Sequence, residues 1–186
     1  AKTWHELVVA STKPPKRSYP TAVYDPQGKA MVVFGGWDGH DRFDDTWAFD
    51  LAAKTWHEVD VGSTKPPARN YPTAVYDPQG KAMVIFGGYD GHDRLDDTWA
   101  FDLAAKTWHE LVVASTKPPK RSYHTAVYDP QGKAMVIFGG YDGHDRLDDT
   151  WALRPGGSAQ AGRVSLNAKR GLGVPCELCF TVDKSV

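Results

Sequence analysis

The stretch YPTAVYDPQGKAMVIFGGYDGHDRLDDTWAFD, from Tyr71 to Asp102, contains the pattern that decides the fold. Short runs of β-branched, aromatic and aliphatic residues are separated by Pro, Gly and Asp, which is typical of strands and turns. We predict an inner strand at Tyr71–Tyr76, a buried second strand at Lys81–Gly87 and a third strand at Thr98–Asp102. The intervening DPQG has Pro at its second position and Gly at its fourth, as a tight turn prefers, so the first two strands form a hairpin.

The same pattern occurs three times without a gap. AKTWHE stands at Ala1, Ala53 and Ala105, which gives a period of 52 residues, and the first two copies differ at only eight positions. A fourth strand follows the third one in the first two blades, at Thr107–Val112 in the second. Four antiparallel strands cannot bury both faces alone, so neighbouring copies must stack face to face. Radial stacking of such units produces a β-propeller.

Composition and charge limit the class of protein. The chain has 186 residues with seven Trp, eight Tyr and seven Phe, which is enough apolar area for a sizeable core. Its formal net charge of -1 argues against a nucleic-acid partner, and no apolar run is long enough to span a membrane. No secretory signal precedes the first repeat, and the sequence does not indicate a compartment.

The repeat resembles a known family. In RSYHTAVYDPQGKAMVIFGGYDGHDRLDDTWA, Arg121 to Ala152, a glycine doublet follows an apolar strand, and the second copy shows the same doublet before the spaced Trp99 and Trp108. This combination is similar to the kelch repeat. The resemblance implies an all-β, kelch-type β-propeller, and the family ranges from protein-binding modules to metal-dependent enzymes. One departure is proline at positions 20 and 72, where the third copy has the histidine that is commoner in the family.

The phase of the repeat predicts how the ring closes. The chain begins in an outer strand, Thr3–Val8, and the third copy stops after its third strand near Leu153. We expect an orphan outer strand at 1–9, blades at 10–61 and 62–113, and a third blade at 114–154 without its outer strand. Propellers have about four to eight blades. We therefore predict a six-bladed, head-to-tail homodimer in which each Thr3–Val8 strand completes the third blade of the other chain.

The tail, residues 155–186, does not follow the repeat. Its abrupt change of composition indicates a truncation or readthrough junction, or a C-terminal extension. Short strands at Arg163–Leu166 and Cys179–Val182 are compatible with its sequence. Cys176 and Cys179 form a single C-x-x-C, which is a weak zinc or redox signal, and we interpret them as two exposed thiols.

Two loops of each blade should share one rim of the propeller. The loop between the second and third strands and the loop entering the inner strand both lie at the same end of the sheet, around a central channel. The Asp-Gly pairs that begin at Asp38, Asp90 and Asp142 are expected to form turns. The residues predicted to contact a ligand at this rim are Arg17, Tyr19, Arg69, Tyr71, Arg121, Tyr123 and His124.

A structural alternative applies to the three arginines. Asp45, Asp97 and Asp149 are expected to pair with Arg17, Arg69 and Arg121, or to cap backbone amides, as the kelch resemblance implies. If the rim instead holds a metal-dependent hydrolytic site, the guanidinium groups would offer bidentate contacts to an anionic transition state.

The loop histidines have two interpretations, because each is flanked by Gly and Asp and has no core to fill. They are either solvated, or they converge on Zn²⁺ or another divalent metal, with the following aspartates as ligands or supports. An open coordination position would lower the pKa of bound water to about 7 and supply a hydroxide nucleophile. The predicted metal-site residues are His40, His92, His144, Asp41, Asp93 and Asp145.

Two functions follow from these patterns. The leading hypothesis is a binding scaffold whose rim of Tyr, Arg, Asp and His side chains contacts a small molecule or a protein. The alternative is a metal-dependent, phosphotriesterase-like hydrolase of esters or phosphoesters that uses the rim histidines. The sequence alone leaves open whether the chain is an enzyme.

Overall fold

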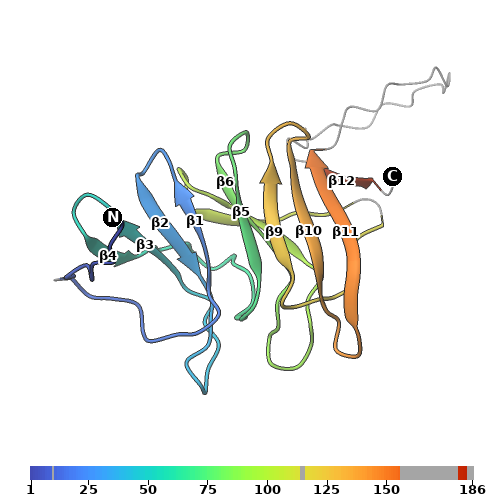
Figure 1. The fold of residues 1–186 in the computed structure, drawn as a ribbon, viewed down its shortest axis with the longest axis horizontal. Helices are drawn as coiled ribbons and strands as arrows, with labels where there is room; N and C mark the ends of the chain where they lie inside the picture. The colour runs from blue at the N-terminus through green and yellow to red at the C-terminus, as the bar shows by residue number, and fades with distance from the viewer. Residues whose placement is uncertain (10, 114–115, 156–179, 184–186) are drawn as a thin grey trace.

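A computed structural model describes residues 1–9, 11–113, 116–155 and 180–183. The described residues form three four-stranded antiparallel sheets and no helix, so no helix there could cross a membrane (Figure 1). The all-β prediction is confirmed, and the first three strands of each sheet come from one copy of the repeat.

The strands follow one another as simple meanders. The first sheet contains β1 (Thr21–Asp25), β2 (Ala30–Phe34), β3 (Thr46–Asp50) and β4 (Thr55–Glu58). The second contains β5 (Thr73–Asp77), β6 (Ala82–Phe86), β7 (Thr98–Asp102) and β8 (Thr107–Glu110). The third contains β9 (Thr125–Asp129), β10 (Ala134–Tyr141), β11 (Arg146–Pro155) and β12 (Phe180–Asp183).

The hairpin turn has the predicted chemistry. The carboxylate of Asp77 accepts hydrogen bonds from the backbone amides of Gln79 (2.9 Å) and Gly80 (3.2 Å). Lys81 then adopts a φ of 50°, which returns the chain into β6. The side chain of Asp77 therefore performs the turn-forming role that Asp has at such positions.

The core lies between successive sheets, and the inner strands β1, β5 and β9 follow one another near the middle of the molecule (Figure 1). One face of the first sheet, with Val32 and Phe34, packs on the facing side of the second, with Met83, Phe101 and Trp108. A second cluster repeats this arrangement between the second and third sheets. The stacking of copies face to face, expected from the period, is therefore observed.

The outer edge of the third sheet differs from our prediction. We expected this sheet to lack a fourth strand within the chain, but β12 pairs antiparallel with β11, with Leu153 opposite Val182. The edge of a sheet presents a row of unpaired amide and carbonyl groups. Because these are backbone groups, an extended segment can form hydrogen bonds with them without matching the sequence of the repeat. The predicted strand at Arg163–Leu166 and both cysteines lie outside the described residues.

The N-terminal segment, predicted as the outer strand of another chain, has no strand structure. Residues 1–9 form no helix and pair with no sheet, and Trp4 is fully exposed. Dimerisation is not tested by the structure of one chain.

Candidate binding rim

The loops between second and third strands form the rim as repeated turns. In the first, the carboxylate of Asp38 accepts hydrogen bonds from the amides of His40 (2.8 Å) and Asp41 (2.7 Å). These two hydrogen bonds hold the pKa of Asp38 below its usual value. Asp90 and Asp142 make the same contacts in the other two loops. Their predicted role as turn formers is confirmed.

Three tyrosines form a stack at the entry to the inner strands, which we name the tyrosine ladder: Tyr19, Tyr71 and Tyr123. Their ring centroids are 4.1 Å and 3.9 Å apart. All three have φ values near 60°, an unusual conformation for a bulky residue that turns each ring toward the next sheet. Burial raises the pKa of Tyr71, and its tyrosine neighbours raise it further. Tyr71 therefore keeps a neutral hydroxyl at the centre of a row of aromatic faces.

A second row, the arginine–aromatic ladder, consists of Arg42, Tyr89, Arg94 and Tyr141. The guanidinium carbon of Arg42 lies 4.8 Å from the ring centroid of Tyr89. Arg94 lies between two rings, 5.0 Å from that of Tyr89 and 4.8 Å from that of Tyr141. Each arginine thus reaches across to the aromatic residue of the next sheet. Such cation–π contacts fix the orientation of long, otherwise mobile side chains.

This second row was not predicted from the sequence. The arginine and the aromatic residue belong to the same repeated loop, but their contact joins different copies. The sequence does contain a signal for this row, because an Arg and a Tyr or Trp recur at fixed positions in every loop. Stacking of the copies therefore places these residues beside one another along the rim.

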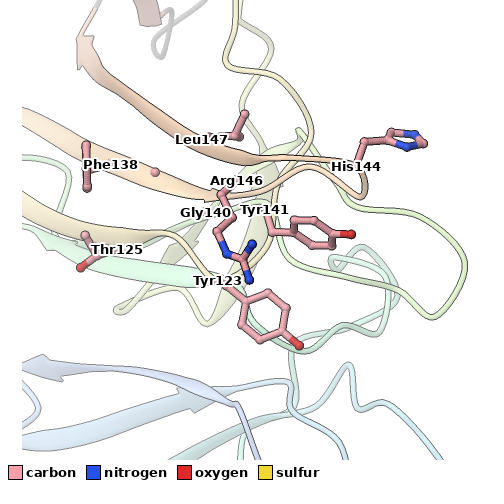
Figure 2. Close-up of a pocket in the computed structure, with 9 residues that line it drawn as sticks. Tyr123, Thr125, Phe138, Gly140, Tyr141, His144, Arg146 and Leu147 are labelled. Atoms are coloured by element: carbon pink, nitrogen blue, oxygen red, sulfur yellow. The ribbon is translucent and has the colours of Figure 1, made fainter.

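Both ladders end at an open hollow of about 670 Å³ on the third sheet. Its lining includes Tyr123, Thr125, Phe138, Gly140, Tyr141 and Arg146 (Figure 2). Figure 2 shows Arg146 directed toward Tyr123, whereas His144 extends from the β10–β11 turn away from that pair. The hollow therefore combines apolar strand surface with the last members of the two ladders.

The arginines predicted to contact a ligand form hydrogen bonds inside the blades. Arg69 is fully buried and donates to both carboxylate oxygens of Asp97, at 2.6 and 2.7 Å. It also donates to the carbonyls of Gly87 and Pro67, both at 3.0 Å. The guanidinium of Arg69 therefore uses these hydrogen-bond donors within the blade, and a ligand contact by Arg69 stays a prediction.

The pairing is the same in the other two sheets. Arg17 and Arg121 bind Asp45 and Asp149 through two hydrogen bonds each, and Arg121 is fully buried. The structural alternative is therefore confirmed for all three arginines. Burial of Asp97 works to raise its pKa, but the hydrogen bonds and charge of Arg69 outweigh it and lower the pKa.

His124 also lies away from the rim surface. Its Nε2 atom is 2.7 Å from Thr73 Oγ1 of the second sheet, and its ring meets the Phe86 ring edge-on at 5.4 Å. Burial, together with the charge of Arg121, lowers the pKa of His124 to about 4. This histidine is a neutral, buried contact between two sheets, and a ligand contact by His124 stays a prediction.

The predicted metal ligands remain separate within one chain. His40, His92 and His144 are exposed, as are Asp41, Asp93 and Asp145. No three His, Cys, Asp or Glu side chains among the described residues are grouped to hold a metal ion. The aspartates contribute to the loops through their backbone atoms, and zinc binding by these residues stays a prediction.

Comparison with known proteins agrees with this geometry. The family model of the KLHDC2/KLHL20/DRC7 Kelch-repeats domain matches residues 1–159. The chain belongs to the kelch-repeat family. It is 35% identical over 139 residues to a leucine-zipper-like transcriptional regulator 1 homolog of Drosophila melanogaster, covering 70% of this chain and 14% of that protein.

Two further relatives show the same partial coverage. An F-box/kelch-repeat protein of Arabidopsis thaliana is 36% identical over 68% of this chain and 28% of its own length. Dynein regulatory complex subunit 7 of Chlamydomonas reinhardtii is 31% identical over 61% of this chain and 10% of its own length. The matched region thus spans less than a third of each of these relatives.

Proposed function

We propose that this kelch chain is a protein-binding module whose contact surface is the rim formed by the tyrosine and arginine–aromatic ladders. The observation that carries the proposal is the alignment of stacked Tyr and Arg side chains along one end of all three sheets. Tyr, Trp and Arg are the residues most enriched among those that dominate binding energy at protein interfaces.

The stacking prepares these side chains for binding. The guanidinium of Arg94 is held between Tyr89 and Tyr141. It therefore loses little further conformational entropy when Arg94 binds a partner, and less of the binding free energy is lost in ordering this side chain. Its N–H groups suit carboxylates or backbone carbonyls, while the tyrosine hydroxyls donate and accept hydrogen bonds. We therefore expect the rim to bind an exposed segment of another protein.

We also propose that two copies of the chain close one ring of six blades. Support comes from the three-blade repeat, which is too short for a closed propeller, and from apolar side chains exposed on the last sheet. Closure would place the rim loops of both copies around a common channel. The metal-dependent hydrolase is a separate prediction that no contact among the described residues favours.

The binding proposal is tested by selecting ligands from a displayed library of random peptides and measuring their affinities by calorimetry. Replacing Arg94 by Ala should weaken a selected peptide at least tenfold, or about 1.4 kcal/mol. Lys120→Ala is the matched control, because it also removes one positive charge and because Ala68 stands at the equivalent place in the second copy. Equal affinities of wild type and Arg94→Ala would contradict the proposal, as would a library that yields no specific binder.

A further inference from the structure

We propose that the open hollow on the third sheet is the docking site for Arg17–Pro20 of a second copy. On this view, each seam of the ring repeats the contact that already joins the sheets within one chain. The inference rests on the proposed homodimer and specifies which surfaces form it.

The internal contacts show what fills an equivalent hollow. Between the second and third sheets, the Gly88 amide donates to the Arg121 carbonyl (2.9 Å), and the Arg121 amide donates to the Leu95 carbonyl (3.0 Å). The first and second sheets exchange the same pair of hydrogen bonds through Arg69. Gly140 and Leu147 occupy these positions on the third sheet. The matching arginine is then Arg17 of a second copy.

Apolar side chains of the third sheet, Phe138 in the hollow and Val127 outside its lining, are exposed for the same reason. Val23 and Val75 are 8% and 5% exposed because the next sheet covers them, whereas Val127 at the same position is 60% exposed. Likewise Phe86 is 4% exposed and Phe138 is 51% exposed. Burying two side chains of this size contributes roughly 1.5–3 kcal/mol each.

The first sheet presents the complementary free face. Tyr24 is exposed, whereas its equivalents Tyr76 and Tyr128 pack against the clusters between sheets. One chain therefore has one free face of each kind, and the two faces have the sequences that already fit together internally. Two copies related by a twofold axis satisfy both faces at two identical seams.

Docking would also complete the rim. Arg42 and Arg94 each lie over the ring of the next sheet, and the next ring for the exposed Arg146 is Trp37 of the second copy. Trp is the strongest aromatic partner in cation–π contacts. Tyr123 would stack in the same way on Tyr19 of the second copy. Each seam is thus a composite part of the binding rim, incomplete in a single chain.

This docking is independent of the outer edge of the third sheet. The hollow lies on the face of β9 and β10 and at the β10–β11 turn, whereas β12 pairs with the outer edge of β11. The contact through Arg17–Pro20 therefore forms with β12 in place, whichever segment finally occupies that edge.

The test is sedimentation equilibrium of the full chain and of three variants at micromolar concentration. Val127→Asp should weaken dimerisation at least a hundredfold, because it places an unpaired charge in the seam. Tyr24→Asp, on the complementary face, should do the same. Val112→Asp is the control, since Val112 is exposed and Asp60 stands at the equivalent place in the second copy. Circular dichroism would show that each variant keeps its sheets.

The outcomes separate this inference from the proposals on which it rests. A dimeric wild type with monomeric Val127→Asp and dimeric Val112→Asp supports the docking site. A wild type that stays dimeric through both face substitutions would place the seam elsewhere and overturn the inference while keeping the homodimer. A monomeric wild type would overturn both, and the peptide affinities would still test protein binding by the rim.

Discussion

At the residue scale, the buried arginines define what each blade requires. Arg69 and Arg121 have no exposed surface, and the indole N–H of Trp99 adds a 2.8 Å hydrogen bond to the same carboxylate that Arg69 binds. Arginine, carboxylate and tryptophan thus tie the entry to the inner strand to the start of the third strand. Because Arg69 also donates to the Gly87 carbonyl, it holds both ends of the rim loop, at Gly87 and at Asp97.

Replacing Asp97 by Asn should destabilise the fold by about 3–5 kcal/mol, because it leaves the buried Arg69 guanidinium without its counter-charge. Urea unfolding measures the loss. Asp93→Asn, in the same loop but exposed, should change the stability by less than about 0.5 kcal/mol. Similar unfolding midpoints for the two variants would contradict the structural role of the pair.

His124 should make stability depend on pH. Its pKa is about 4 in the folded chain against 6.5 ordinarily, so the unfolded state binds a proton that the folded state does not. Stability should therefore fall as the pH drops from about 6.5 to 4, by about 2 kcal/mol at pH 5 relative to pH 7.5.

His124→Pro is the matched variant, since Pro20 and Pro72 occupy the same position in the other copies. Its stability, measured by urea unfolding at pH 7.5 and pH 5, should lack this component of the pH dependence. An unchanged difference between the two pH values would show that His124 titrates normally in the folded chain.

These residues also show how far the sequence predicts the site. The pairing of Arg69 with Asp97 was foreseeable because the family resemblance implied it at matching places in all three copies. The burial of His124 was not, because that histidine occurs once and is enclosed by Thr73 and Phe86 of the preceding sheet. Burial depends on the neighbouring blade, which is not apparent from the spacing within one repeat.

At the element scale, the strands were predictable and the edges were not. The strand Thr98–Asp102 was predicted with its observed bounds, and Asp77 forms the predicted turn between β5 and β6. Three repeats of one pattern reveal where apolar runs begin and end. The tail has no repeat to compare with, so its strand β12 was anticipated only approximately, at Cys179–Val182, and its pairing with β11 was not foreseen.

The edge of β11 should be able to accept either β12 or Thr3–Val8 of a second copy. Val182→Pro removes a backbone donor and should weaken β12, because proline is poorly tolerated within a paired strand. In the dimer, the amides of Thr3–Val8 should then become more protected from hydrogen exchange. Val182→Ala, which keeps the amide, is the control. Unprotected Thr3–Val8 amides in a dimeric Val182→Pro variant would rule out this exchange of strands.

At the scale of the whole molecule, the stack of three blades explains which sheet faces are buried and which are exposed. Val75 is covered by the next sheet, and Val127 at the equivalent position is exposed because no further sheet follows it among the described residues. The sequence predicted a shortage of blades from the period alone. It could not identify the hollow at Tyr123 and Arg146, because that surface exists only where the stack ends.

The number of blades around one axis in a crystal structure of this chain tests this account most directly. We predict two chains and six blades, with Tyr123 of each chain stacked on Tyr19 of the other and with Val127 and Phe138 buried at both seams. A three-bladed chain whose Val127 and Phe138 remain in solvent, or a ring joined through other surfaces, would contradict it.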